Sequence, residues 1–302
     1  MTITHIRTLA YILLVTLLLA CNSKGDAPKT QDKRLTPADS TLLIAVMPTL
    51  DCLPLYVAEA SGLFENQHIN VRLVKYNAQM DCDTALLRGR VHGAFTDLVR
   101  AEQMRKKGAS LKELGATNLH WQLITNRNAR IKDVRQLGDK MVGMTRFSGT
   151  DFLVTDLIDR YKPKNEVFRI QVNNVFIRLK MLVGNEIDAA FLSEPQATVA
   201  RLAKNNVLAD TQKKDILLGV AVFTTNNKHQ KMVNQSLPAF VKAYHMACDS
   251  LNTKGILHYA DLLKTHFKLN DAALNALPKV VFNKFKPVRE KDKNAIKDFS
   301  TQ

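Results

Sequence analysis

Short strand-like segments that alternate with helix-like segments constrain the fold of this chain more than any other feature. The first pair lies in residues 42–64, where the apolar run 42–47 ends at Pro48 and, after a polar loop, a helical pattern opens at Pro54 and stops at Gly62. Proline suits the first turn of a helix and glycine the position after its end. This order predicts a strand, a loop and a helix, with the loop at the strand's carboxyl end, where α/β sheets bind ligands.

The same order recurs along the chain. We expect further strands, each followed by a loop and a helix, at 69–76, 91–95, 140–144, 167–172 and 187–192. After a last strand at 219–224 the pattern is helical. The chain is therefore predicted to be α/β, with two βα blocks and a helical segment that returns to cover the first block.

The composition is that of a globular protein, and the net charge limits the classes of partner to be considered. Hydrophobic residues make up 46% and charged residues 24% of 302 residues, which is enough chain for two cores. The formal net charge of +15 is compatible with nucleic acid, an anionic membrane or an anionic ligand. Because there is one Trp and the basic residues are not interleaved with aromatic ones, we expect no nucleic-acid partner.

Motifs of catalysis or cofactor binding are not evident. The sequence has no HExxH, P-loop or GxGxxG pattern, and no CxxC or Cys/His cluster with zinc spacing. We therefore expect a protein that is not an enzyme, with no cofactor and no metal.

The first 21 residues predict export. A basic start precedes an apolar run at 9–19, which is too short to span a membrane, and the segment ends Leu18-Leu19-Ala20-Cys21. This ending resembles a bacterial lipobox, which implies cleavage before Cys21 and a diacylglycerol anchor on its sulfur. An uncleaved membrane anchor and a plain signal peptide are the alternatives. Residues 22–40 are polar and read as a flexible tether.

Three passages carry a resemblance to a known family: LPLYVAEASGLFENQHINVRLVKY (53–76), GAFTDLVRAEQMRKKG (93–108) and IRLKMLVGNEIDAAFLSEPQATVARLA (177–203). They resemble the periplasmic substrate-binding proteins of ABC importers, in the type II group for nitrate, sulfonates, taurine and thiamine precursors (NMT1/THI5-like). The chain departs from this group at its C-terminus, which lacks a helix containing Trp and a Gly-Leu-Ile tail.

The resemblance implies a two-lobed periplasmic-binding-protein type II fold, in which two βα domains are joined by two hinge strands. We expect lobe 1 at 41–124 plus 222–302, lobe 2 at 125–221, and hinges near 122–126 and 220–226.

It also implies a lipid-anchored monomer on the periplasmic side of the cell envelope. Such a protein captures a small solute, an aminopyrimidine or a small organic anion, and delivers it to an ABC permease. An enzyme on the same fold, similar to a pyrimidine-precursor synthase or a menaquinone-pathway enzyme, is the main alternative, and a surface-attached sensor is another.

In the first lobe the expected ligand-binding residues follow the first three strands: Asp51, Cys52, Tyr56, Gln79, Asp81, Thr96 and Asp97. Three carboxylates on one rim favour a ligand that carries an amine. Asp81 and Asp97 could instead cap helices, and Tyr56 could pack in the core.

In the second lobe the expected ligand-binding residues are Arg146, Ser148, Gly149, Thr150, Asn174 and Glu194. Backbone N–H groups at a helix start, with two hydroxyls and a nearby cation, are typical of an anion site. Arg146 could instead be a solvated surface residue, Asn174 could form a turn, and Glu194 could cap its helix.

Cys52, Cys82 and Cys248 remain after the predicted cleavage. Disulfides persist in exported proteins. Because the first two strands of the implied fold are adjacent, the loops after them are neighbours. We therefore expect a Cys52–Cys82 disulfide and a free Cys248.

Overall fold

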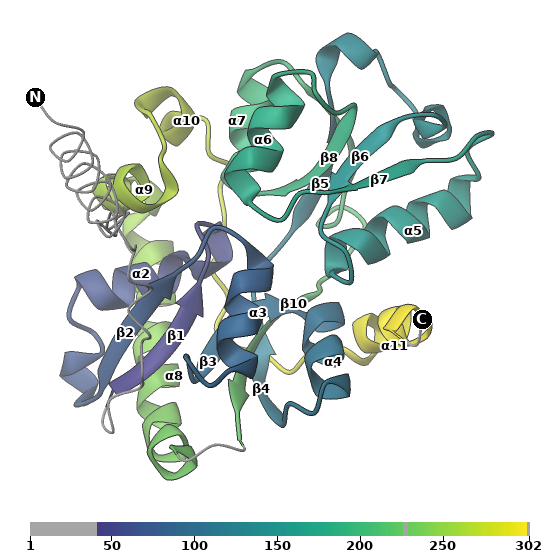
Figure 1. The fold of residues 1–302 in the computed structure, drawn as a ribbon. Helices are drawn as coiled ribbons and strands as arrows, with labels where there is room; N and C mark the ends of the chain where they lie inside the picture. The colour runs from purple at the N-terminus through teal and green to yellow at the C-terminus, as the bar shows by residue number, and fades with distance from the viewer. Residues whose placement is uncertain (1–40, 226–228, 301–302) are drawn as a thin grey trace, which may run out of the picture. The chain divides into compact units, whose positions relative to one another are not determined.

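The computed structural model describes residues 41–225 and 229–300 of the chain, which form two lobes, each built on a five-stranded sheet with helices on its faces (Figure 1). The strand order is β2-β1-β3-β10-β4 in the first sheet and β7-β6-β8-β5-β9 in the second. The predicted α/β, two-lobed class is confirmed. The predicted leader and tether, residues 1–40, lie outside the described residues.

In the first lobe the strands are β1 (Thr41–Val46), β2 (Asn70–Lys75), β3 (Gly93–Asp97), β4 (Leu111–Ala116) and β10 (Gly219–Thr224). Helices α2 (Leu53–Ala60), α3 (Gln79–Leu87) and α4 (Leu98–Lys106) follow the first three strands. Strands β1 to β3 run parallel, and β10 runs antiparallel to β3 and β4. The apolar run of β1 is buried almost throughout, as in parallel sheets covered on both faces.

In the second lobe the strands are β5 (Trp121–Thr125), β6 (Met141–Met144), β7 (Phe168–Gln171), β8 (Ala189–Ser193) and β9 (Asn206–Asp210). Its helices are α5 (Gly149–Tyr161), α6 (Val175–Val183) and α7 (Gln196–Leu202). Helices α6 and α7 pack on β5 and β8 through a core that contains Leu182, Ile124 and Ala200. Strand β9 was not predicted, because its residues are exposed or half-buried at a sheet edge and lack an apolar run.

The chain crosses between the lobes earlier than expected. β5 pairs with β8 and β9 inside the second sheet, and β10 pairs with β3 and β4 inside the first. The segments expected to be hinges, 122–126 and 220–226, are therefore largely strands of a sheet interior. The crossings lie at 117–120 and 211–218, so the second lobe begins near Trp121.

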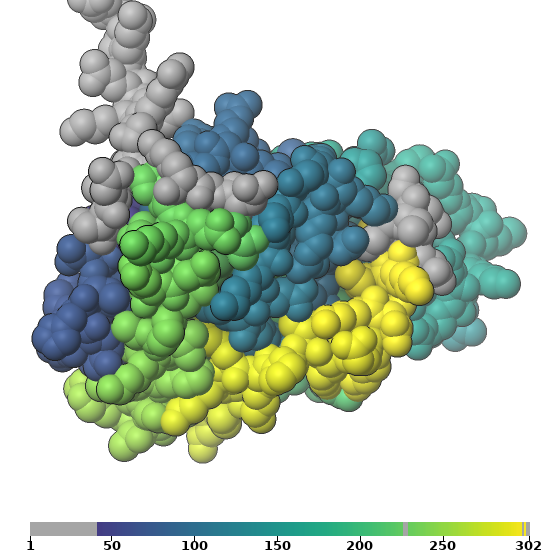
Figure 2. Space-filling view, turned by 90° about the horizontal axis from the view of Figure 1, so that it is seen from below, coloured from purple at the N-terminus to yellow at the C-terminus, as the bar shows by residue number. Residues whose placement is uncertain are grey.

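After β10 the chain is helical and returns over the first lobe, as predicted. Its helices are α8 (Gln230–Lys254), α9 (Ala260–Phe267), α10 (Asp271–Asn275) and α11 (Glu290–Ser300). Phe240 of α8 stacks on Phe64 with ring centroids 5.8 Å apart, and α11 lies along α4 (Figure 2). Among the helices of the described ranges, none combines the length and apolarity needed to cross a membrane.

Candidate functional site

Loops at the carboxyl ends of the strands meet across the lobes in pairs. The loop after β1 joins the loop after β8, where Leu50 N donates to Glu194 O at 2.9 Å. The loop after β2 joins the loop after β7, where Val175 N donates to Asn77 O at 3.0 Å. The third pair joins the end of β3 to the start of α5. The described lobes are therefore in contact, and the expected loops converge on one region.

A small cavity, which we call the inner chamber, lies among these loops. Its volume is about 50 Å³, and both lobes line it. The predicted residues that reach it are Asp51, Gln79, Asp97, Ser148 and Thr150.

A larger cavity, the outer chamber, adjoins the inner one. Its volume is about 490 Å³, and its walls include the first crossing, the loop after β8 and residues 278–281. Asp51, Leu119 and Ser193 line both chambers. The two chambers together can hold a solute larger than the inner chamber alone admits.

Asp51 stands between the chambers with an unused acceptor. Its side chain is only 3% exposed. Its Oδ2 accepts a hydrogen bond from Thr117 Oγ1 at 3.3 Å, whereas Oδ1 has no hydrogen-bond partner in the described part of the chain. Burial raises the pKa of this carboxyl above its ordinary value. Because a buried unpaired acceptor is costly, this atom is placed to receive a donor.

Asp97 reaches from the first lobe to the second. It caps α4 by accepting from Arg100 N at 2.9 Å, and its carboxyl group lies against Gly149 at the start of α5. A Cβ at Gly149 would lie 3.3 Å from the Asp97 Cγ, so glycine lets the carboxyl group come this close without a shift of either lobe. Burial raises the pKa of Asp97 to about 6, although the guanidinium of Arg100 opposes the rise.

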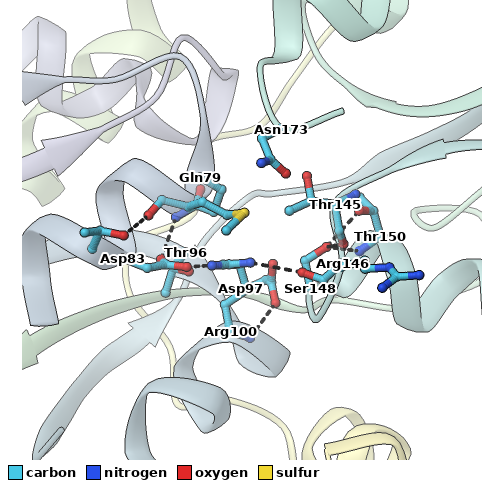
Figure 3. A network of polar contacts seen from close by, with 12 residues as sticks. Gln79, Asp83, Thr96, Asp97, Arg100, Thr145, Arg146, Ser148, Thr150 and Asn173 are labelled. Atoms are coloured by element: carbon cyan, nitrogen blue, oxygen red, sulfur yellow. Dashed lines mark hydrogen bonds and ion pairs between the residues drawn. The ribbon is translucent and has the colours of Figure 1, made fainter. Parts of the chain in front are cut away.

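A polar network that the sequence did not reveal supports this side of the site (Figure 3). Asp83 forms a buried ion pair with Arg100, and it accepts from Gln79 Nε2 at 3.3 Å and Thr96 Oγ1 at 3.4 Å. Arg100 also donates to the carbonyl of Arg146 at 3.3 Å. Two of the predicted residues, Gln79 and Thr96, therefore form hydrogen bonds with another side chain of the protein. The only signal for Asp83 was its position four residues after Gln79 in one helix.

The hydroxyl groups of Ser148 and Thr150 in the second lobe also accept hydrogen bonds from nearby backbone N–H groups. Ser148 Oγ accepts from Thr150 N at 3.1 Å, and Thr150 Oγ1 accepts from Thr145 N at 3.0 Å. Arg146, expected to be the cation of an anion site, is exposed and does not line the inner chamber; its side chain points away from Asp97 in Figure 3. A ligand-binding role of Arg146 stays a prediction that this geometry does not support.

Arg178 is the cation that lines the inner chamber instead. It is 4% exposed, and it donates to the carbonyls of Val172 and Phe191 and to Thr145 Oγ1. No ion pair with a described acidic residue accompanies these bonds, and burial lowers its pKa to about 10. Sequence reasoning missed Arg178, because nothing in the sequence distinguishes it from a surface arginine.

Of four other predicted residues, three have structural roles and one, Asp81, lies away from the chambers. Tyr56 packs against His266 and Phe267, and Asp81 is exposed and lines neither chamber. Asn174 caps α6 by accepting from the two amides that follow Val175. Glu194 accepts from Thr198 N at 3.1 Å and pairs with Arg201 at 2.7 Å, although it also lines the outer chamber.

Comparison with known proteins assigns the chain to a family. The sequence profile of the NMT1/THI5-like family matches residues 49–253, more than half of the chain. The chain belongs to the NMT1/THI5-like family. No curated protein matches the sequence significantly.

Several solved structures are similar to this chain in fold. A ligand-binding component of an ABC-type import system from Staphylococcus aureus, with zinc bound, has a TM-score of 0.71 and 18% identity, over 87% of this chain and 93% of that one. The aliphatic sulphonate-binding protein SsuA of Escherichia coli has a TM-score of 0.68 and 15% identity, over 87% and 91%. The nitrate-binding protein NrtA of Synechocystis PCC 6803 has a TM-score of 0.66 and 15% identity, over 79% and 69%. At these identities the likeness establishes the periplasmic-binding-protein fold.

This NMT1/THI5-like chain does not carry the expected disulfide. Cys52 and Cys82 are buried free thiols, and Cys248 is a third. Cys52 ends the short turn before α2, and Cys82 faces inward from α3; burial, the largest cause, raises the pKa of both thiols. Separately, no group of three His, Cys, Asp or Glu side chains in the described ranges could hold a metal ion.

Proposed function

We propose that this protein is the solute-binding component of an ABC importer. It captures a small solute in the inner and outer chambers between its lobes and delivers that solute to a permease. The observation that carries the proposal is Asp51 Oδ1, a buried acceptor without a partner at the junction of the two chambers. A bound solute supplies the missing donor and removes the cost of the unpaired atom.

The fold gives this site a way to open. Within the described residues, the chain connects the lobes at 117–120 and 211–218 alone, while loop contacts such as Leu50 N to Glu194 O hold them together. We propose that these crossings are the hinges, and that the lobes part to admit solute and close around it. A lipid on Cys21, followed by the tether 22–40, would keep the protein at the membrane beside its permease.

Native mass spectrometry tests solute capture. Protein purified from its own host under gentle conditions should carry a small molecule that is released intact on denaturation. Asp51→Asn should retain much less of it, and Asp81→Asn, which changes an exposed carboxylate of the same type outside both chambers, should retain it fully. Recovery of a chemically converted molecule would indicate an enzyme on this fold and would contradict the proposal.

Membrane attachment and delivery need separate measurements. Cys21→Ser should move the protein from the membrane fraction to the soluble periplasmic fraction. The retained solute, supplied in radiolabelled form to vesicles that contain the neighbouring permease, should enter only when the binding protein is added. Entry at the same rate without the protein would contradict delivery.

A further inference from the structure

We propose that the site selects solutes that present N–H donors and carry no net negative charge, and that Asp97 enforces this choice by occupying the start of α5 itself. This inference rests on the proposed function and names the class of solute. It is carried by three features of the chambers: an unpaired acceptor, a helix start that is already occupied, and a cation whose hydrogen bonds are already used.

The unpaired acceptor is Asp51 Oδ1. Thr117 serves the other oxygen of this carboxylate. Asp51 is 3% exposed and lines both chambers, and its Oδ1 has no hydrogen-bond partner among the described residues. An anionic solute would bring a second acceptor to this point and leave both unpaired. An amine, amidine or ring N–H would complete the hydrogen bond.

The helix start is that of α5, a helix of 13 residues. The N-terminus of such a helix attracts an anion through its free N–H groups and its dipole. Here the carboxyl group of Asp97 already lies against Gly149, with its Cγ 3.3 Å from the place a Cβ would take, and Ser148 Oγ accepts from Thr150 N. The first lobe thus delivers its own carboxylate to the place that an anionic solute would take.

The cation is Arg178. Its guanidinium is bound to Val172 O, Phe191 O and Thr145 Oγ1, which hold it along the chamber wall. Two carboxylates, Asp51 and Asp97, line the same chamber. In the inner chamber, one positive charge with two carboxylates favours a neutral or cationic group of the solute over an anionic one. The outer chamber adds two acidic residues, Glu194 and Asp210, and two basic ones, Arg201 and Lys279, so it does not reverse this balance. The outer chamber, at about 490 Å³, leaves room for the rest of such a molecule beyond Asp51.

Simple probes distinguish the two classes of solute. Acetamidinium chloride supplies a planar cation with N–H donors, and tetramethylammonium chloride supplies a cation without them. Sodium nitrate and sodium methanesulfonate supply anions, with sodium chloride holding the ionic strength constant. Thermal unfolding and isothermal titration are measured for the protein after any endogenous solute has been removed by reversible unfolding. The wild type should show saturable stabilisation by acetamidinium and none by the other three.

Variants assign the roles. Asp51→Asn keeps the side-chain shape and should weaken acetamidinium binding by about tenfold or more, as expected for the loss of a charged hydrogen bond. Asp97→Ser keeps a good cap for α4 but is too short to reach Gly149, so this variant should gain saturable binding of nitrate. Asp81→Asn is the matched control and should behave as the wild type. Circular dichroism and urea unfolding establish that each variant is folded.

Four results would overturn the inference: saturable binding of either anion by the wild type, no response to acetamidinium, an unchanged affinity in Asp51→Asn, or no gain of nitrate binding in Asp97→Ser. These outcomes are separable from a failure of the proposed function. An intact anionic solute recovered by native mass spectrometry would support solute capture while rejecting this class of solute.

Discussion

At the scale of single residues, burial rather than sequence position determines the chemistry of the important side chains. Burial raises the pKa of Asp51 and Asp97 and lowers that of Arg178, because each charge has left water for a site with few counter-charges. Asp51 and Asp97 belong to the proposed solute site. His92 lies outside it, and its burial predicts how the free energy of unfolding depends on pH.

His92 should make the protein less stable below neutral pH. It is fully buried, its Nδ1 accepts from Leu43 N at 3.0 Å, and burial followed by the nearby His229 lowers its pKa to about 4. Between pH 6.5 and 4 the unfolded chain binds a proton that the folded chain does not, so the free energy of unfolding falls as the pH drops. The loss is at most about 3 kcal/mol, and His92 contributes no pH dependence above pH 6.5.

His92→Asn tests this prediction, since its amide oxygen can replace Nδ1 as the acceptor. Urea unfolding at pH 7.5 and 4.5 should show a smaller loss of stability in His92→Asn than in the wild type. His258→Asn, at an exposed site, is the control. Equal losses in the wild type and His92→Asn would contradict the assignment.

At the scale of elements, one polar side chain adds to the apolar packing that holds α6 on its sheet. Arg178 donates from the helix to the carbonyl of Val172 just after β7, to that of Phe191 within β8, and to the Thr145 hydroxyl after β6. A single guanidinium therefore connects α6 to three neighbouring segments of the second lobe, and these bonds compensate for the burial of its charge.

Arg178→Met should destabilise the protein by about 2–5 kcal/mol, because two or three buried acceptors lose their donors. Arg169→Met is the control: Arg169 is an exposed arginine of the same lobe that pairs with Asp151 at 3.4 Å, and its loss should cost less than about 1 kcal/mol. Urea unfolding midpoints at pH 7.5 measure both. A loss for Arg178→Met no greater than that of the control would mean that water replaces the guanidinium.

At the scale of the whole described molecule, several contacts hold the two lobes together, among them helix α10 against α7 and loops that meet in pairs. One of them is a bridge between Ala78 of the first lobe and Asn174 of the second, with Val175 N bound to Asn77 O beside it. In the described part of the chain, the backbone passes from one lobe to the other only at the two crossings. If the lobes must part to exchange solute, then a covalent link at this bridge should stop the exchange.

Ala78→Cys with Asn174→Cys provides this link. Residues opposite each other in an antiparallel bridge have Cα atoms about 4.5–5.5 Å apart, which suits a disulfide. Once oxidised, the double variant should release its co-purified solute at least about tenfold more slowly than the wild type, as followed by native mass spectrometry after dilution. Reduction should restore the rate, and each single variant should release solute normally. Unchanged release from the oxidised form would show that solute leaves without lobe opening.

The sequence was informative wherever a structure depends on neighbours along the chain. The apolar run before Pro48 is a strand, Pro54 lies in the first turn of α2, and the helical return after β10 is present. Because strands, loops and helices alternate, the loops that carry Asp51, Asp97 and Ser148 could be assigned to one region from the sequence alone. The leader and its Cys21 remain a prediction of the sequence.

Only the tertiary structure decided which side chains face that region. From the sequence, residues 121–125 could not be assigned to a hinge or to a sheet strand. The partners of β5, strands β8 and β9, lie far away in the sequence. Arg146 faces outward and Arg178 inward, although both are arginines beside the same loops. The sequence by itself determined a two-lobed α/β chain with its polar loops between the lobes. Tertiary packing decided burial and direction, and therefore that Asp97 of one lobe meets the start of α5 in the other.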